Sequence, residues 1–217
     1  MYKPFIRNHQ YNFMKKQADL LQNTLRTNAD LKVLESVKYS VQSKIVDLFP
    51  DVPASEKAML GSISTVEKAE DFQAYLRQFV PYVSEFPAIT EKQIQKLFPK
   101  NKKLKVPDLS TIDYRYITYL SWVDISTNKL FLVYHQNGQF IGIEGKYTLT
   151  SKKSFCFLCN RFEELVLFSA VSKTRPAKSS PDYYKSVGNY LCMDSQACNK
   201  NITDTLALEK FIAAVVG

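Results

Sequence analysis

Two cysteine pairs decide the fold of this chain: Cys156-Phe157-Leu158-Cys159 and Cys192-Met193-Asp194-Ser195-Gln196-Ala197-Cys198. A Cys-x2-Cys knuckle places two thiolates about 4 Å apart, close enough to share one tetrahedral zinc ion, and a second pair completes the shell. In a reducing cytoplasm a disulfide framework is disfavoured, and a lone redox Cys-x-x-Cys would leave Cys192 and Cys198 unexplained. The spacing therefore predicts one structural Zn²⁺ held by Cys156, Cys159, Cys192 and Cys198.

The order of elements around the cysteines indicates the type of zinc site. A knuckle follows a hairpin region, two short strands come next, and the second pair stands just before a final helix. That order is typical of a treble-clef finger. Four thiolates leave no open position on the metal, so we expect the ion to stabilise the fold and to take no part in catalysis.

The flanking sequence predicts a mixed sheet and helix domain over residues 85–217. Asn137-Gly138 separates the apolar runs 130–135 and 139–145, which is a strong hairpin signal. Further strands are expected at 114–120, 165–168 and 190–192, and Thr90-x-x-Gln93 opens a short helix that Pro99 ends. Asn201 is expected to cap a last helix that carries Leu208, Phe211, Ile212 and Val215.

The first 84 residues predict four amphipathic helices. Apolar positions at helical spacing indicate a helix over 8–27 and a second that begins after Asn28 and Asp30 and stops at Pro50. A short third helix covers 53–61, and a Ser64/Glu67 capping box opens a fourth that runs to about 83. The expected fold is an α+β two-domain protein: an N-terminal four-helix bundle over 1–84, then an α/β domain over 85–217 that contains a four-cysteine treble-clef zinc finger.

Composition narrows the possible functions. The chain has 29 basic and 21 acidic residues, a net charge of +8, with an excess of +2 in 1–84 and +6 in 85–217. It has only six Gly, and neither GxGxxG nor GxxxxGK(S/T) occurs, so nucleotide binding is not expected. Its two histidines, His9 and His135, are not part of a Gly-x-Ser-x-Gly or His-Glu-x-x-His motif, so the usual signatures of a hydrolase are missing. No apolar run approaches the roughly 18 residues of a membrane span, and the first residues lack a signal-peptide core. We expect a cytoplasmic protein that is not an enzyme.

Several segments resemble the FusB-type elongation factor G-binding proteins, the fusidic acid resistance family. The resemblance is carried by Phe155-Cys156-Phe157-Leu158-Cys159-Asn160, by 188–195 and by Cys198-Asn199-Lys200-x-Ile202-Thr203-Asp204. His9-Gln10-Tyr11-Asn12 and Gly142-x-Glu144-Gly145 extend it over nearly the whole chain. It implies the same two-domain fold that the residues predict.

The resemblance also implies a partner and a mechanism. Proteins of this family bind the C-terminal domains of elongation factor G and promote its departure from ribosomes stalled by fusidic acid. We therefore expect this chain to meet the factor on the ribosome and to act by recognition, without making or breaking a covalent bond. We also expect it to be a monomer. Phe155, Tyr190 and Phe211 keep the aromatic types that the family uses against the factor. A family member has Lys where this chain has Val187, and the nearest cation here is Lys185, which is therefore included in the expected contact.

Two other functions compete with this interpretation. A basic zinc-finger domain with the lysines of 100–105 and an aromatic platform of Tyr114, Tyr116 and Tyr119 would suit ribosomal RNA, either as the main function or as an auxiliary contact. An enzyme that uses Asp113, Asp124 or Glu144 as acid or base is the weaker alternative, because no second carboxylate stands at a spacing that demands a shared site.

Overall fold

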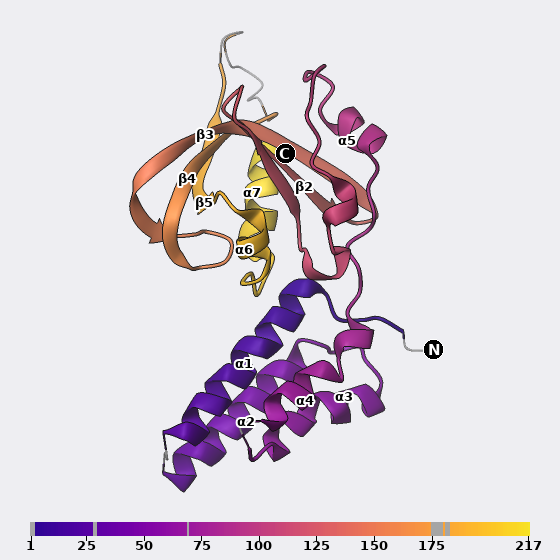
Figure 1. Cartoon of the computed structure of the whole chain (residues 1–217), viewed down its shortest axis with the longest axis vertical. Helices are drawn as coiled ribbons and strands as arrows, with labels where there is room; N and C mark the ends of the chain where they lie inside the picture. The colour runs from indigo at the N-terminus through magenta and orange to yellow at the C-terminus, as the bar shows by residue number, and fades with distance from the viewer. Residues whose placement is uncertain (1–2, 28–29, 69, 175–179, 181–182) are drawn as a thin grey trace. The chain divides into compact units, whose positions relative to one another are not determined.

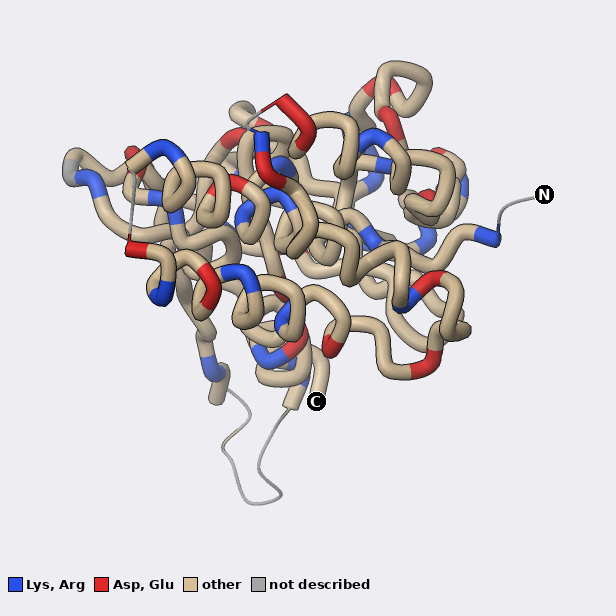
Figure 2. The backbone as a smooth tube through the Cα atoms, turned by 90° about the horizontal axis from the view of Figure 1, so that it is seen from below, with Lys and Arg blue, Asp and Glu red and all other residues tan. Residues whose placement is uncertain are grey.

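The computed structural model describes residues 3–27, 30–68, 70–174, 180 and 183–217. The chain forms two compact units, Met1–Ser84 and Glu85–Gly217, which are described separately (Figure 1). In both units, basic and acidic residues are interspersed along the backbone (Figure 2). None of the helices in the described part of the chain has the length and apolar character needed to cross a membrane.

Unit 1 is helical. It contains α1 (Asn8–Arg26), α2 (Leu31–Asp47), α3 (Ala54–Gly61) and α4 (Asp71–Arg77), with 3₁₀ helices at Ser62–Thr65 and Val80–Tyr82. Asp30 caps α2 by accepting a hydrogen bond of 2.8 Å from the amide of Lys32, whereas Asn28 lies outside the described residues. Ile6 pairs with Val83, so the first and last segments of the unit lie side by side.

The fourth predicted helix is shorter than expected. Its predicted start at Ser64 is wrong, because the Ser64 hydroxyl donates backwards to the carbonyl of Gly61 and closes a 3₁₀ turn instead of capping a helix. Its predicted end near 83 is also wrong. The α-helix ends at Arg77, and Pro81, which has no amide hydrogen to donate, lies in the following 3₁₀ helix.

Unit 2 is built on one antiparallel sheet with its strands in chain order. The strands are β1 (Leu120–Asp124), β2 (Lys129–Gln136), β3 (Gln139–Phe155), β4 (Phe162–Val171) and β5 (Ser186–Cys192). The predicted Asn137-Gly138 hairpin joins β2 to β3 and is confirmed: both turn residues have positive φ, 51° and 77°, as a tight hairpin turn requires. At Gly145 an added Cβ would stand 2.4 Å from the carbonyl oxygen of Ser169, so β3 and β4 approach closely there.

Each face of the sheet carries its own core. The helix α5 (Glu91–Leu97) supplies Ile94 to the core that contains Phe131 and Val133 of β2. The helix α7 (Leu206–Val216) packs into the other core, which also holds the four cysteines. The predicted cap of α5 is confirmed, because Thr90 and Gln93 form a reciprocal capping box.

Three details of unit 2 differ from the expectation. Residues 114–116 form a 3₁₀ helix, so the strand predicted over 114–120 begins only at Leu120, because the Asp113 carboxylate accepts from the amide of Arg115 and turns the chain. Asn201 does not cap the last helix; its side-chain amide donates to the carbonyl of Ala197. A short helix, α6 (Ser195–Asn199), was not predicted.

Candidate metal centre

The first cysteine pair lies in the turn between β3 and β4. Cys156 follows the last residue of β3, and the amide of Asn160 donates to its carbonyl at 2.9 Å while Asn160 takes a left-handed φ of 55°. Asn is one of the few residues that adopt this conformation readily. The tight turn points the sulfurs of Cys156 and Cys159 toward one place.

The second pair comes from the end of β5 and from α6. Cys192 ends the strand, and Asp194 then caps α6 by accepting from the amides of Gln196 and Ala197 at 2.8 and 3.2 Å. The cap starts the single helical turn that carries Cys198 back toward Cys192. The spacing of five residues between Cys192 and Cys198 therefore accommodates the N-cap and the first turn of α6.

The four sulfurs form one cluster. All lie within 4.8 Å of one another, with 3.9 Å between Cys156 and Cys198 and 3.7 Å between Cys159 and Cys192. A tetrahedral Zn²⁺ with bonds of about 2.3 Å needs sulfurs about 3.8 Å apart, so the cluster has the size of a zinc site. All four side chains are buried.

The electrostatics of the cluster also favour a cation. Hydrogen bonds from Cys159, Cys192 and Cys198 lower the pKa of the Cys156 thiol, and the bond to Cys156 then raises the pKa of Cys198. One sulfur can thus ionise easily, but its charge opposes ionisation of the next. A divalent metal removes this conflict because it binds all four as thiolates. Zinc bound in this way would hold β3, β5 and α6 together.

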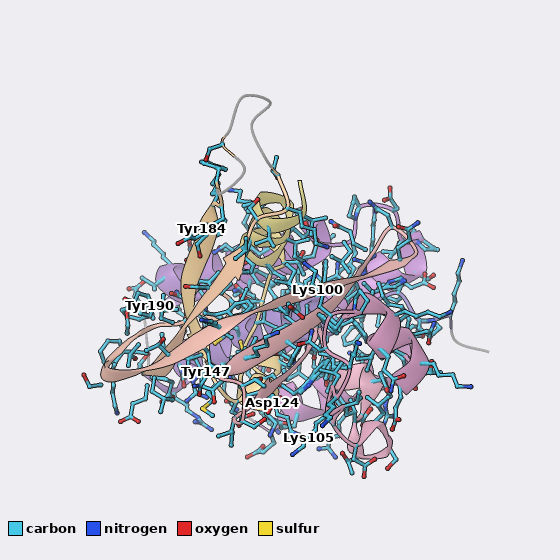
Figure 3. The ribbon with its side chains drawn as sticks, turned by 90° about the horizontal axis from the view of Figure 1, so that it is seen from above. Lys100, Lys105, Asp124, Tyr147, Tyr184 and Tyr190 are labelled. Atoms are coloured by element: carbon cyan, nitrogen blue, oxygen red, sulfur yellow. The ribbon has the colours of Figure 1, made fainter. Side chains whose placement is uncertain are left out.

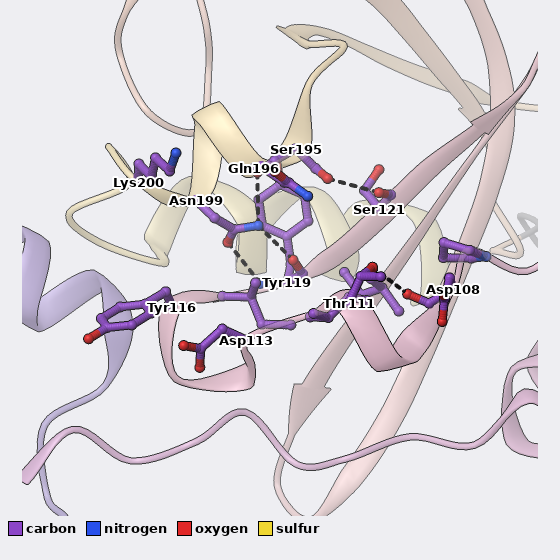
Figure 4. Close-up of a pocket in the computed structure, with 14 residues that line it drawn as sticks. Asp108, Thr111, Asp113, Tyr116, Tyr119, Ser121, Ser195, Gln196, Asn199 and Lys200 are labelled. Carbon is purple, nitrogen blue, oxygen red and sulfur yellow. Dashed lines mark hydrogen bonds between the residues drawn. The ribbon is translucent and has the colours of Figure 1, made fainter. Parts of the chain in front are cut away.

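Next to the cluster, Asn199 joins α6 to the start of β1. Its side chain is 2% exposed; its Oδ1 accepts from the amide of Thr118 at 2.7 Å and from that of Tyr119 at 3.3 Å (Figure 4). Its Nδ2 donates at 2.9 Å to the carbonyls of Tyr119 and Ser195. The side-chain oxygen and nitrogen of Asn199 both form hydrogen bonds, so this residue, which follows Cys198, is held against the start of β1.

A cavity of about 340 Å³ opens beside this contact. Among the residues that line it are Asp113, Tyr116, Ser195, Asn199 and Lys200 (Figure 4). The Asp113 carboxylate is paired with Arg115 at 2.8 Å, and this contact holds its pKa below the ordinary range. That carboxylate is therefore a poor proton donor or acceptor near neutral pH.

The other carboxylates considered for catalysis have local partners as well. Asp124 accepts from the hydroxyl of Ser126 at 2.6 Å, which lowers its pKa, and Lys105 on the same face adds a favourable charge (Figure 3). Glu144 forms an ion pair with Lys129 at 3.4 Å and accepts from the side-chain amide of Asn101. Asp124 and Glu144 are therefore each engaged by neighbouring side chains, as is usual for carboxylates on a protein surface or along a strand.

The residues predicted to contact a partner are placed differently from one another. Phe155 is 59% exposed and Lys185 is also exposed. Tyr190 is 46% exposed (Figure 3). Phe211 is only 3% exposed and packs against Phe157 and Phe168 at 5.5 and 5.6 Å between ring centroids. Phe211 belongs to the core, so it is not retained in the contact surface.

Sequence reasoning missed two residues of this region. Phe162, the first residue of β4, is 56% exposed and its ring lies 5.1 Å from that of Phe155. Its position three residues after Cys159, opposite Phe155 across the knuckle, was a usable signal. The role of Asn199 had none, because its partners lie about 80 residues earlier in the chain.

The aromatic platform expected for RNA does not form as predicted. Tyr119 is completely buried, and Tyr114 and Tyr116 lie in a 3₁₀ helix, so no strand presents the three rings together.

Fold and site together define a protein with a helical unit followed by a unit that carries a four-cysteine treble-clef zinc finger. Residues 5–87 match the family model for the N-terminal part of elongation factor G-binding proteins, and residues 95–211 match the FBP C-terminal treble-clef zinc-finger model. The chain therefore belongs to the elongation factor G-binding protein family, as the sequence resemblance indicated.

A solved structure supports the same family. The structure of the fusidic acid resistance protein FusC is 30% identical in sequence, with 97% of each chain covered and a TM-score of 0.79. Comparison with curated protein sequences found no match. The two-domain layout predicted from the sequence is that of the FusC structure.

Proposed function

We propose that this protein binds the C-terminal domains of elongation factor G and promotes release of the factor from ribosomes stalled by fusidic acid. The observation that carries the proposal is the family match over both units, together with the similarity to the fusidic acid resistance protein FusC. The protein would act in the cytoplasm as a monomer, by recognition alone. Binding shifts a release equilibrium if the protein prefers the free or departing factor over the stalled one.

The proposed contact surface extends from the zinc knuckle along β5. We define this knuckle surface as Phe155, Phe162, Tyr190 and Lys185, of which Lys185 precedes β5 at the end of the strand opposite Cys192. The two phenylalanines flank the first cysteine pair with their rings tilted by 56° to each other, and the carbonyl of Tyr190 accepts from the amide of Phe157 at 2.9 Å. Exposed aromatic rings on a rigid support lose little conformational freedom on binding, which makes them good interface anchors.

Lys185 has a different role in this surface. Its side chain is exposed, while its carbonyl accepts from the amide of Ser172 at 2.7 Å, so the backbone that carries the charge is fixed. A cation at the rim mainly speeds approach to an acidic partner, and salt screens it. Together with the +6 excess of residues 85–217, it favours a partner surface rich in carboxylates.

Calorimetry with purified elongation factor G and the full chain tests the binding step. Tyr190→Ala is expected to weaken the complex by about 2 kcal/mol, roughly 30-fold in Kd. Tyr39→Ala is the matched control, because Tyr39 is 75% exposed but lies on α2 in unit 1. Equal affinity for all three chains would remove the knuckle surface from the proposal, and no binding by the unaltered chain would refute the proposal itself.

The release step needs its own assay. Translation inhibited by fusidic acid should recover when the unaltered chain is added and should stay inhibited with Tyr190→Ala. A chain that binds the factor but restores no translation would limit the function to binding.

One zinc ion per chain, held by the four cysteines, is part of the proposal. Metal analysis should give one equivalent, and Cys198→Ser should lower both zinc content and the stability of unit 2, since structural zinc contributes on the order of 10 kcal/mol in small fingers. Unit 1 should keep its helices. A Cys198→Ser chain with unchanged zinc and stability would contradict the four-thiolate site.

A further inference from the structure

The side chain of Tyr119 lies in the core next to the zinc cluster and has an unusual hydroxyl. The residue is completely buried and belongs to the same core as all four cysteines. Among the residues that the structure describes, none forms a hydrogen bond of ordinary geometry with its Oη atom. A buried hydroxyl without a partner is costly, and most such groups in proteins are satisfied. The hydroxyl of Tyr119 therefore needs an acceptor among the groups around it.

The four cysteines belong to the same buried core as this hydroxyl. Burial does most to raise the pKa of Tyr119, and Cys198 is the neighbouring residue that raises it most. A phenol near several sulfurs has one favourable arrangement, in which its hydrogen points at a thiolate. The hydrogen bond is strong only if that sulfur is ionised, as it is when it binds a metal.

Asn199 links the backbone of Tyr119 to the helix that carries Cys198. It bonds both the amide and the carbonyl of Tyr119, and it is the next residue after Cys198. The Ser195 hydroxyl adds a second tie from α6 to the carbonyl of Ser121 at 2.8 Å. The start of β1 and the helix that bears Cys198 thus form one rigid unit, which holds the phenol in place.

We propose that Tyr119 donates a hydrogen bond to the Cys198 thiolate of the zinc centre and so acts as a positioning residue for the metal. Four thiolates and one Zn²⁺ carry a net charge of −2 in a buried core, and a donor to sulfur spreads this charge and slows loss of the ion. The inference rests on zinc occupancy, which metal analysis of the unaltered chain tests separately.

The test compares zinc binding by the full chain and by Tyr119→Phe, which keeps the ring and removes only the hydroxyl. Competition with a chromophoric chelator should show affinity for zinc lowered by about 10-fold or more, the usual effect of removing such an outer partner. Tyr134→Phe is the matched control: Tyr134 lies in the same core, but its hydroxyl donates to Glu209 at 2.8 Å. The control should bind zinc as the unaltered chain does.

A second readout separates a bond to sulfur from a general loss of packing. With Co²⁺ in place of zinc, the sulfur-to-metal charge-transfer band should shift in Tyr119→Phe and stay unchanged in Tyr134→Phe, because only the first substitution alters a thiolate. Equal zinc affinity of Tyr119→Phe and the unaltered chain overturns the proposal, and so does weaker binding with an unchanged cobalt band.

A measurement on the unaltered chain covers the case in which Tyr119→Phe does not fold. In the cadmium-loaded protein, NMR should show a correlation between the metal and the hydroxyl proton of Tyr119, transmitted through the hydrogen bond. A hydroxyl proton without that correlation overturns the proposal. A chain that binds no metal at all refutes the zinc centre and this inference together, whereas failure of the hydrogen bond alone leaves the zinc centre intact.

Discussion

Replacing Asn199 by Ala should destabilise unit 2 more than any other change at a polar residue of α6. The substitution removes two side-chain partners of buried backbone groups: the acceptor that the amides of Thr118 and Tyr119 share, and the donor to the carbonyl of Tyr119. Each such partner lost costs about 1–3 kcal/mol, so the two together cost about 4 kcal/mol. Ala is the better helix former by up to about 0.7 kcal/mol. The expected net loss in the free energy of unfolding is therefore about 3 kcal/mol.

The chain offers a built-in probe for this measurement. Trp122 is its one tryptophan and lies in β1, the strand that Asn199 holds, where its ring stacks on Phe131 at 5.3 Å. Urea unfolding of the zinc-loaded chain, followed by tryptophan fluorescence, reports on unit 2 without a signal from unit 1. Circular dichroism of the same samples follows all the helices, most of whose residues lie in unit 1.

Asn201→Ala is the control for this experiment. Asn201 is half-buried and makes one bond to a helix carbonyl, that of Ala197 at 2.7 Å, so its loss should cost about 1 kcal/mol or less. The reasoning fails if Asn199→Ala stays within about 1 kcal/mol of the unaltered chain, on the scale of that single bond. It fails equally if Asn201→Ala lowers the free energy of unfolding as much as Asn199→Ala does, because the hydrogen bonds to Tyr119 would then add no stability.

Three further predictions follow from particular contacts. Gly138→Ala should cost about 1 kcal/mol in the same urea assay, since an added Cβ meets open space and only the left-handed backbone resists it; no change would mean that the turn tolerates the strain. Phe211→Ala should cost about 3–5 kcal/mol, whereas exposed Phe155→Ala should cost less than about 1, and the reverse order would contradict their burial. In unit 1, burial raises the pKa of Tyr75 above its ordinary value near 10, so stability that is complete below pH 10 should fall as pH rises beyond it. Tyr75→Phe should remove that part of the alkaline loss when the helical signal is followed with pH, and an unchanged profile would refute it.

The parts of the fold that the sequence predicted well depend on neighbouring residues. The Asn137-Gly138 turn and the Thr90/Gln93 capping box each need only two to four residues to define their geometry. The cysteine cluster is similar, because each pair is a local turn and only their meeting requires the fold. Such features are visible in a single sequence.

The errors arose where side chains competed with a pattern, or where a distant contact decided the outcome. The aromatic and β-branched content of 114–120 favoured a strand, but Asp113 bonds the backbone two residues on and forms a 3₁₀ turn. Phe211 shares a stripe with Leu208 and Val215, and a stripe alone does not say which of its members stay covered. Burial depends on Phe157 and Phe168, which belong to other elements.

The proposed metal centre and the proposed contact surface share the same backbone. Phe155 directly precedes Cys156, Phe162 follows Cys159 by three residues, and Tyr190 precedes Cys192 by two. A zinc ion that fixes these cysteines would therefore fix the three rings, without any contact between the metal and the partner. Removal of zinc by a chelator should consequently abolish binding to elongation factor G, because the knuckle would no longer hold the three rings in place. Such a loss would not show that the metal itself contacts the partner. Tyr190→Ala separates the two effects, because it removes a ring and leaves every sulfur in place.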